Sequence, residues 1–516
     1  MRYRSLLLAV ALLTAVVVGS APAAAQAYIP ISGEGSTWSA NALDQWRKNV
    51  QQYGMKVTFT GTGSTQGRNQ FKTRQVDFAV SEIPYGRTDN NVYDEPPKFG
   101  YAYMPIVAGG TALMYNLKIG RNRVTNLRLS GDTVAKIFTG VITKWDDPAI
   151  KADNPGLALP ARKVIPVVRS DGSGTSAQFT EWMSVQHSGI WNDFCRKAGK
   201  STPCGFTSNY PLVSPVIGQN GSLGVANYVR QEQSEGAITY VEYSYARNAR
   251  FPVAKLLNAA GYYIEPTSRA VAVALLQAKI KPDLTQDLRG VYNDDDARTY
   301  PLSSYSYMIL PTEAVGKFTP EKGRTLSDFA YYFLCEGQHQ AERLGFSPLP
   351  VNLVDAGMDQ VAKIPGSTRQ QKDLSKCNNP TFSKDGSNTL AKTAPQPPAC
   401  DKKGPTQCTS GTGGARDRTP ISRPGADPGS DDPADDPAGD DPADPDDPAN
   451  PDDPADTPGG DKPPPTSTAT ASPTPTASTS TRKPANRSAA PARARPQSRS
   501  PSTSATATRP CSSSPA

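Results

Sequence analysis

The chain has 516 residues, with 55 Lys and Arg against 48 Asp and Glu, and a formal net charge of +7. So small an excess over so long a chain indicates neither a nucleic acid nor any other particular partner. Of the 49 prolines, 26 lie in residues 386–516, where no aromatic residue occurs, so this segment cannot bury enough apolar surface to fold. The length therefore does not translate into about three domains of roughly 150 residues each.

The first 27 residues have the layout of a secretory signal peptide. Two arginines precede an apolar run over residues 6–18, and small residues follow at 21–27. This order is typical of a leader that is cleaved on export, here after Ala25 or Ala27. The run is shorter than the ~20 residues that a membrane-spanning helix needs. No cysteine follows it as a site for a lipid anchor. We therefore expect a secreted, extracellular protein.

Residues 28–384 alternate between helical and extended patterns. Leu43, Trp46, Val50 and Tyr53 recur at helical spacing, and a glycine at position 54 ends the pattern. Further helices are expected at 67–74, 129–139 and 326–334, and strands at 57–60, 76–80, 106–117, 164–168, 237–241 and 307–310. The order strand, helix, strand predicts an α/β fold with mostly parallel strands. The stretch 106–117, which we expect to be broken at Gly109-Gly110, is long enough to cross between two lobes.

Six of the seven cysteines lie in pairs along the chain. The pairs are Cys195 with Cys204, Cys335 with Cys377, and Cys400 with Cys408, which leaves Cys511 over. In an exported protein disulfides are the expected use of such cysteines, although spacing alone does not fix the connectivity. A zinc site is the alternative, but the spacings are irregular and the chain has only two histidines. We expect no metal and no cofactor.

Residues 385–516 are expected to be a disordered tail rich in Pro, Asp, Ser and Thr. Residues 427–461 hold 14 aspartates and no basic residue, whereas residues 462–516 hold 8 basic residues and no acidic one. A proline-rich stretch of this kind is an extended spacer of ~3.1 Å per residue. The tail is therefore a candidate for contact with a cell wall.

Three short loops rich in Gly, Ser and Thr, at 35–38, 63–65 and 171–176, each follow a predicted strand. In α/β sheets ligands bind beyond the carboxyl ends of strands, where backbone N–H groups and hydroxyls can surround an oxyanion. Arg169 can grip such an anion at two points, and Asp171 can hold its guanidinium in place. Any one loop alone is better explained as an ordinary turn or helix cap. Three loops and an arginine together favour an anion site.

Sequence motifs for catalysis are not found. Residues 61–63 lack the third glycine of a dinucleotide-binding loop, and no phosphate-loop lysine motif occurs. Ser173 does not lie in a Gly-x-Ser-x-Gly turn, and neither His187 nor His339 has the context of a catalytic base. We therefore expect a binding protein and not an enzyme.

Six segments together resemble the PstS-type phosphate-binding proteins of phosphate ABC importers. They are GEGSTW (33–38), GTGS (61–64), VDFAVSE (76–82), IFTGVITKWDDPAI (137–150), VRSDGSGTS (168–176) and GAITYVEYSYA (236–246). The match runs from Ile31 to about Pro350. It implies a two-lobed periplasmic-binding-protein-like fold of type II that closes on one phosphate ion. Lobe 1 would comprise about 28–112 plus 290–384, and lobe 2 about 113–289.

Carried over position by position, the resemblance implies eight phosphate ligands and one supporting carboxylate. The ligands are Thr37, Trp38, Ser64, Glu82, Arg169, Ser173, Gly174 and Thr175, and Asp171 would hold the arginine. Glu82 is the one acceptor in this set, so it would select an anion that carries a proton, as phosphate does and sulfate does not. It stands where the family usually has aspartate, and Trp38 stands where it usually has phenylalanine.

The function that the resemblance implies is capture of inorganic phosphate outside the cell by a monomeric binding protein, which hands it to the membrane subunits of an ABC permease. Two alternatives stay open at this point. One is a secreted phosphatase-like enzyme of the same fold, with Ser64, Ser173 or Thr175 as nucleophile. The other is a wall-retained phosphate-binding or adhesion protein that has no permease.

Overall fold

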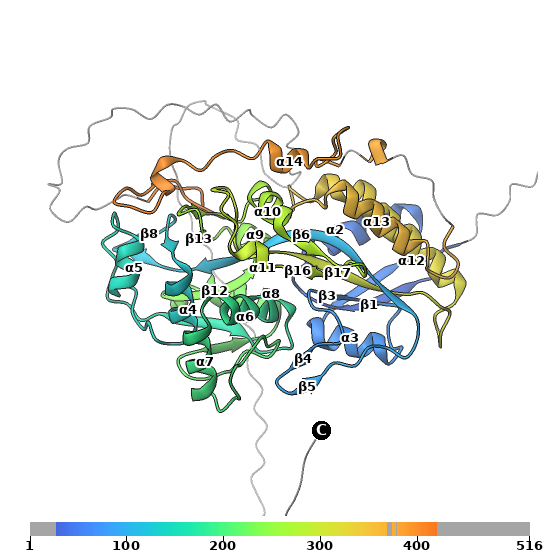
Figure 1. Ribbon diagram of the computed structural model, residues 1–516, viewed down its shortest axis with the longest axis horizontal. Helices are drawn as coiled ribbons and strands as arrows, with labels where there is room; N and C mark the ends of the chain where they lie inside the picture. Colours follow the sequence, from blue (N-terminus) through green and yellow to red (C-terminus); the bar gives the residue numbers. More distant parts are fainter. Residues whose placement is uncertain (1–26, 369–373, 378, 420–516) are drawn as a thin grey trace, which may run out of the picture. The chain divides into compact units, whose positions relative to one another are not determined.

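A computed structural model of the chain describes residues 27–368, 374–377 and 379–419. Its main sheet runs in the order β11-β10-β12-β6-β17-β3-β1-β2, with β13, β9 and β14 attached beside β6 (Figure 1). The strands of the main path are β1 (Ile31–Gly35), β2 (Val57–Gly61), β3 (Phe78–Ser81), β6 (Tyr101–Tyr115), β10 (Ile165–Arg169), β11 (Ile217–Gln219), β12 (Ala237–Glu242) and β17 (Ser303–Pro311). The attached strands are β9 (Arg128–Leu129), β13 (Val253–Leu257) and β14 (Tyr263–Ile264). Three two-stranded hairpins lie apart from this sheet, and they are β4 (Thr88–Asp89) with β5 (Val92–Tyr93), β7 (Lys118–Ile119) with β8 (Asn122–Arg123), and β15 (Lys279–Ile280) with β16 (Gln286–Asp287).

Strand β6 connects two wings of parallel strands. Its residues 101–110 pair antiparallel with β17, and residues 111–115 pair antiparallel with β12. On one side β17 leads to β3, β1 and β2, and on the other β12 leads to β10 and β11. The expected break at Gly109-Gly110 is wrong, since both residues lie within the strand. Glycine is needed at 109 because a Cβ there would lie 2.7 Å from the Trp38 ring.

Four helices each follow a parallel strand of the wings, and all four begin at the carboxyl edge of the sheet. In chain order they follow β1, β2, β10 and β11 and are α2 (Ala40–Asn49), α3 (Ser64–Lys72), α6 (Gly174–Gln186) and α8 (Gly221–Val229). The remaining helices are α4 (Gly131–Phe138), α5 (Pro148–Asp153), α7 (Ser188–Lys197), α9 (Tyr243–Asn248), α10 (Ser268–Ala274), α11 (Arg289–Tyr292), α12 (Pro320–Gln340), α13 (Val351–Val361) and α14 (Thr389–Lys392).

Most of the predicted elements are confirmed. The periodic stretch from Leu43 forms α2 and a 3₁₀ turn, Val50–Tyr53, which ends at Gly54 with φ of +81°. That left-handed conformation favours glycine and explains the end of the helix. The helix expected at 67–74 begins three residues earlier, at Ser64, because the turn at Gly63 leads directly into it.

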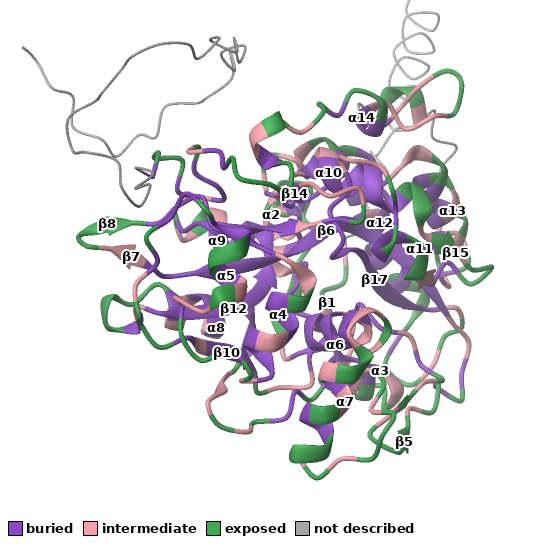
Figure 2. Ribbon diagram, turned by 60° about the vertical axis from the view of Figure 1, so that its left-hand side comes forward, coloured by how far each residue is buried: buried purple, intermediate pink, exposed green. Residues whose placement is uncertain are grey.

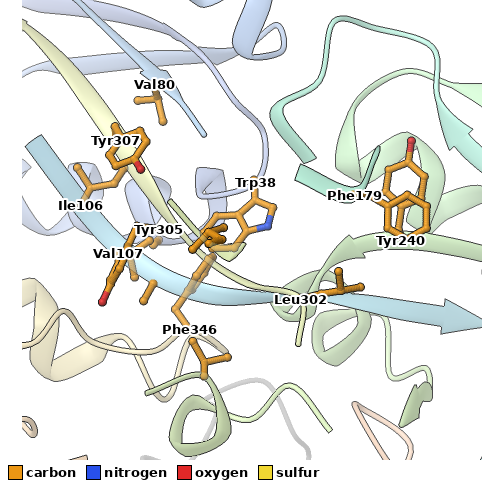
Figure 3. Packing of buried hydrophobic residues seen from close by; sticks show 14 of the residues in the cluster. Trp38, Val80, Ile106, Val107, Phe179, Tyr240, Leu302, Tyr305, Tyr307 and Phe346 are labelled. Carbon is orange, nitrogen blue, oxygen red and sulfur yellow. The ribbon is translucent and has the colours of Figure 1, made fainter. Parts of the chain in front are cut away.

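The buried core follows the central strands, as the purple ribbon along β6, β17 and β12 shows in Figure 2. In one wing the Trp38 ring is wholly buried and meets Phe346 edge to face, with centroids 5.8 Å apart. In the other, Phe179 stacks on Tyr240 at 4.5 Å (Figure 3). Each wing therefore has its own aromatic packing, and the shared strand β6 joins them.

The folded part extends beyond residue 384, so the predicted start of the disordered tail at 385 is wrong for residues 385–419. This segment, orange in Figure 1, crosses the top of both wings. Leu390 and Ala391 pack on α10, and the buried ammonium of Lys255 pairs with Asp401. Composition missed the segment because polar contacts and a disulfide hold most of it. The rest of the expected tail lies outside the described residues, as does the expected signal peptide up to residue 26.

Three disulfides confirm the pairing that the cysteine positions suggested, and they are Cys195–Cys204, Cys335–Cys377 and Cys400–Cys408. The seventh cysteine, Cys511, lies outside the described residues. Within the described part of the chain, no helix combines the length and the apolar character required to cross a bilayer. Nor do the described residues contain a cluster of three or more His, Cys, Asp or Glu side chains able to hold a metal ion.

Candidate functional site

The three loops singled out in the sequence meet at the carboxyl edge of the sheet, and a fourth joins them. They precede α2, α3, α6 and α8, so four helix N-termini converge there. The wings touch at this point, since the backbone N–H of Thr65 donates to the carbonyl of Gly172 at 3.0 Å. The first N–H groups of a helix have no partner within it, and the helix dipole favours negative charge at that end. The location suits an anion.

The carboxylate of Glu82, directly after β3, is wholly buried among hydroxyl groups. Its Oε2 accepts hydrogen bonds from the hydroxyls of Ser36 at 2.6 Å and Ser64 at 2.9 Å, and its Oε1 accepts one from Ser306 at 2.8 Å. Burial raises the pKa of this carboxyl, whereas the three serines and the charge of Arg169 act to lower it. The site thus contains a buried acceptor held by three donors.

Arg169 ends β10 and is 1% exposed. Its Nε donates to Oδ1 of Asp171 at 2.7 Å, and Nη2 donates to Oδ2 of the same carboxylate. Asp171 also accepts the backbone N–H of Gly221, at the start of α8, at 2.9 Å. The third guanidinium nitrogen, Nη1, lies 3.3 Å from the hydroxyl of Ser222. The guanidinium is therefore fixed in one orientation at the edge where the loops meet.

Thr37 joins the two wings through both its side chain and its backbone. Its Oγ1 accepts the backbone N–H of Ser222 at 3.0 Å and lies 2.7 Å from that residue's hydroxyl. Its carbonyl oxygen accepts the hydroxyl of Tyr245 at 2.5 Å. Residues of α8 and α9 therefore hold the first loop from the opposite wing.

Trp38 presents its backbone to the site and its ring to the core. The backbone N–H donates to the Ser36 hydroxyl at 3.0 Å, while Nε1 donates to the hydroxyl of Thr111 at 3.3 Å. The ring itself lies among core residues, with Phe346 beside it (Figure 3). The identity of the ring at position 38 therefore bears on core packing, whereas the donor at the site comes from the backbone.

The start of α6 contributes the remaining expected residues. Ser173 caps the helix, since its hydroxyl accepts the N–H of Ser176 at 3.1 Å. The N–H of Gly174 donates to the hydroxyl of Ser64 at 3.0 Å. The Oγ1 of Thr175 is buried and has no hydrogen-bond partner among the described residues. A buried hydroxyl without a partner is costly, and a ligand oxygen at this helix end would satisfy it.

Comparison with known proteins now identifies the family. A PBP superfamily domain matches residues 18–336. The phosphate-binding protein PstS of Xylella fastidiosa (strain Temecula1) is 32% identical over 327 residues, which cover 63% of this chain and 83% of the relative. PstS of Methanocaldococcus jannaschii is 30% identical over 356 residues, covering 65% and 86%. A solved phosphate-binding protein from Stenotrophomonas maltophilia aligns with a TM-score of 0.46 at 16% identity, covering 70% and 99%.

The chain belongs to the PstS family of the PBP superfamily. The positions that the PstS resemblance implied fall into two hydrogen-bonded groups at the edge described above. In the first, Glu82, Ser64 and Gly174 are linked in series. In the second, Thr37 is linked through Ser222 to Arg169 and its partner Asp171. Trp38 joins the first group through Ser36, whereas Ser173 and Thr175 bond to neither group within the described residues.

Three serines of this PstS-family chain were missed by sequence reasoning. Ser36 lies within the first loop, but the resemblance implied a ligand role only for its neighbours Thr37 and Trp38. Ser222 follows an Asn-Gly pair after the short strand β11, a fourth strand–loop–helix junction that a more complete search for strands would have found. Ser306 lies inside β17, in a stretch that carries no loop or turn signal, and only the tertiary structure brings it to Glu82.

Proposed function

We propose that the protein captures inorganic phosphate at the site where the four helices begin. The relatives named above are called phosphate-binding proteins, and their resemblance to this chain supports the proposal. The observation that carries it is that a buried arginine fixed in orientation, Arg169, and a buried carboxylate, Glu82, lie at the same edge of the sheet amid N–H and O–H donors. The proposed ligands are Thr37, Trp38, Ser64, Glu82, Arg169, Ser173, Gly174 and Thr175.

Glu82 is the proposed source of selectivity. Hydroxyls, backbone N–H groups and an arginine would bind any tetrahedral oxyanion, since all of them donate. A buried carboxylate only accepts, so it matches an anion oxygen that carries a proton and leaves an unprotonated one unpaired. Such a mismatch costs several kcal/mol, or about 10³- to 10⁵-fold in affinity. Phosphate near neutral pH would bind, and sulfate would be rejected.

We further propose an extracellular role in which the two lobes, about 28–112 with 290–384 and about 113–289, close on phosphate and deliver it to an ABC permease. The leader-like N-terminus supports export. The three disulfides suit an oxidising compartment. The relatives are named as binding proteins, which supports binding without catalysis.

The decisive experiment measures equilibrium binding of labelled phosphate to the purified protein, with sulfate as competitor. Saturable binding of one phosphate per chain that excess sulfate does not displace is the expected result. Absence of saturable binding, or equal competition by sulfate, would refute the proposal. Co-purification with permease subunits from membranes tests the transport role separately.

A further inference from the structure

Two serines outside the expected ligand set hold the Glu82 carboxylate at its two different oxygens. Ser36, in the loop after β1, donates to Oε2, whereas Ser306, inside β17, donates to Oε1. Their exposed fractions are 2% and 0%, so water does not compete for these hydrogen bonds. Within the described residues, Ser306 is the one residue of β17 that hydrogen-bonds to this carboxylate, and β17 itself pairs antiparallel with β3.

The protons of these serines have a fixed direction when Glu82 is ionised. A serine hydroxyl has one hydrogen and an ionised carboxylate has none, so each serine must donate to Glu82. The lone pairs of Ser36 are then free to accept the N–H of Trp38 at 3.0 Å. Those of Ser306 face the hydroxyl of Ser39 at 3.0 Å, which therefore donates. Both serines are thus bonded on both sides and cannot turn toward a ligand without breaking a bond.

The third serine has a different position in this network. Ser64 also donates to Glu82, but it belongs to the proposed phosphate ligands and lies at the start of α3. If it turns toward a bound anion, Oε2 keeps the bond from Ser36 and Oε1 keeps the bond from Ser306. The carboxylate then stays in place and has an acceptor position available for a proton carried by the anion.

The charged and titratable groups around Glu82 come from several elements. The charge of Arg169 in β10 favours the ionised form, and Asp171 neutralises part of that charge by pairing with the arginine. Tyr307, the neighbour of Ser306 in β17, is wholly buried, and its pKa is raised so far by burial that the phenol remains neutral. Burial alone raises the pKa of Glu82, and the serine donors oppose this effect. Loss of one donor would raise it further.

We propose that Ser306 and Ser36 are positioning residues that keep Glu82 ionised and correctly aimed, and that they thereby set the preference for a protonated oxyanion and the lowest pH at which it binds. This inference rests on the proposed function. Without Ser306, Oε1 would be a buried acceptor with no donor, and the carboxyl would take up a proton instead. A protonated carboxyl can donate a hydrogen bond to an unprotonated oxygen. The site would then bind sulfate as well and would lose its preference for phosphate.

The test compares Ser306→Ala with Ser306→Thr, which retains the hydroxyl, and with Ser304→Ala. Ser304 is a matched control because it lies in the same strand, is also buried, and has a hydroxyl without a hydrogen-bond partner among the described residues. Calorimetry from about pH 5 to about pH 9 gives phosphate affinity, and sulfate serves as competitor. Because every variant binds the same phosphate, titration of the anion itself cancels in the comparison.

For Ser306→Ala we expect phosphate affinity near neutral pH to fall about tenfold or more. The acid side of its affinity profile should move up by about one pH unit, and sulfate should compete measurably. Ser306→Thr and Ser304→Ala should stay within about threefold of the unchanged protein at every pH. A purely structural role for Ser306 would lower the melting temperature without moving the pH profile, and that result would overturn the inference.

A second measurement separates this inference from the proposed function. The Glu82 carboxyl carbon, labelled with ¹³C and assigned by its loss in Glu82→Gln, can be titrated in the ligand-free protein. A higher titration midpoint in Ser306→Ala supports the inference, and an unchanged midpoint refutes it. If the unchanged protein fails to bind phosphate, the proposed function is wrong, and the link from Ser306 to anion preference falls with it. Should Ser306→Ala not fold, Ser36→Ala removes one of the two donors to Oε2, which keeps the bond from Ser64, so the same changes are expected with a smaller size.

Discussion

Arg169 and Asp171 form a two-point ion pair inside the protein, with side chains that are 1% and 8% exposed. Nε reaches Oδ1 at 2.7 Å and Nη2 reaches Oδ2. Two parallel N–H···O bonds fix the plane of the guanidinium as well as its position. Desolvating both charges costs free energy that their attraction must offset, so removal of either partner alone leaves an uncompensated buried charge.

The first prediction concerns this pair. Arg169→Met should abolish phosphate binding and lower the free energy of unfolding by about 3 kcal/mol, because the Asp171 carboxylate is left buried and unpaired. The double variant Arg169→Met/Asp171→Asn should regain most of the stability but none of the binding. Urea unfolding and phosphate calorimetry check both statements. Retained affinity in the double variant would show that the site is elsewhere.

The exposed pair of Arg289 and Asp287 is a matched control for this prediction. It has the same spacing of two residues along the chain and a similar two-point geometry. The arginine side chain is 71% exposed, so water screens the interaction. We expect Arg289→Met to change neither phosphate affinity nor the urea midpoint. A large effect there would mean that substitution of arginine as such, and not the buried site, explains the first result.

The second prediction concerns the space at Gly174. A Cβ at this position would lie 2.0 Å from Oε2 of Glu82 and 2.4 Å from the hydroxyl of Ser64. Gly174→Ala should therefore displace the carboxylate, lower phosphate affinity about a hundredfold or more, and destabilise the fold by about 1–3 kcal/mol. Gly189→Ala in α7 is the control, since a Cβ there meets nothing within 4 Å. It should leave binding unchanged and raise helix stability slightly.

The third prediction concerns the pH dependence of stability at Glu82. Burial raises the pKa of this carboxyl above its usual value. The folded state therefore holds the proton more tightly than the unfolded chain, and the resulting stabilisation is complete at acidic pH and lost as the pH rises through the raised pKa. Glutamine has no such dependence. Ligand-free Glu82→Gln should thus melt above the unchanged protein near pH 8, and the difference should shrink toward pH 4.

Glu242→Gln supplies the comparison for that experiment. Glu242 ends β12, is wholly buried, and has a pKa raised well above the usual value by burial. Its substitution should give the same trend of melting temperature with pH, while phosphate affinity stays within about threefold. Glu82→Gln, in contrast, should lose phosphate selectivity over sulfate. A stability difference at Glu82 that does not vary with pH would contradict the prediction.

Much of the fold could be predicted because its signals are local. Helical spacing from Leu43 to Tyr53 and the apolar runs at 76–80 and 237–241 mark buried faces that the structure retains. Gly109 misled the interpretation, because a glycine that makes room for the Trp38 ring cannot be distinguished in sequence from one that ends a strand. The decisive observation there is a tertiary contact.

The candidate site was predictable where loops carry it and not where strands do. Arg169 and Asp171 lie two residues apart, so their pairing could be proposed from sequence. Ser306 lies 224 residues from Glu82, and it arrives only because β17 pairs antiparallel with β3, with Tyr307 opposite Ser81. No pattern near residue 306 specifies that register.

The last prediction concerns the segment after residue 384, whose polar contacts composition could not reveal. Lys255 of β13 and Asp401 form an ion pair with side chains that are 10% and 5% exposed. Lys255→Met should leave that carboxylate buried without its cation and cost about 3 kcal/mol in the free energy of unfolding. Lys392→Met, which removes the partner of Asp385 from an exposed pair, should have no measurable effect.

Truncation of the chain tests the same segment as a whole. Ending the chain after residue 419 should preserve the melting temperature, whereas ending it after residue 385 should lower it, because the contacts of Leu390 and Asp401 are then lost. Equal melting temperatures for the two truncated chains would refute a stabilising role for residues 386–419.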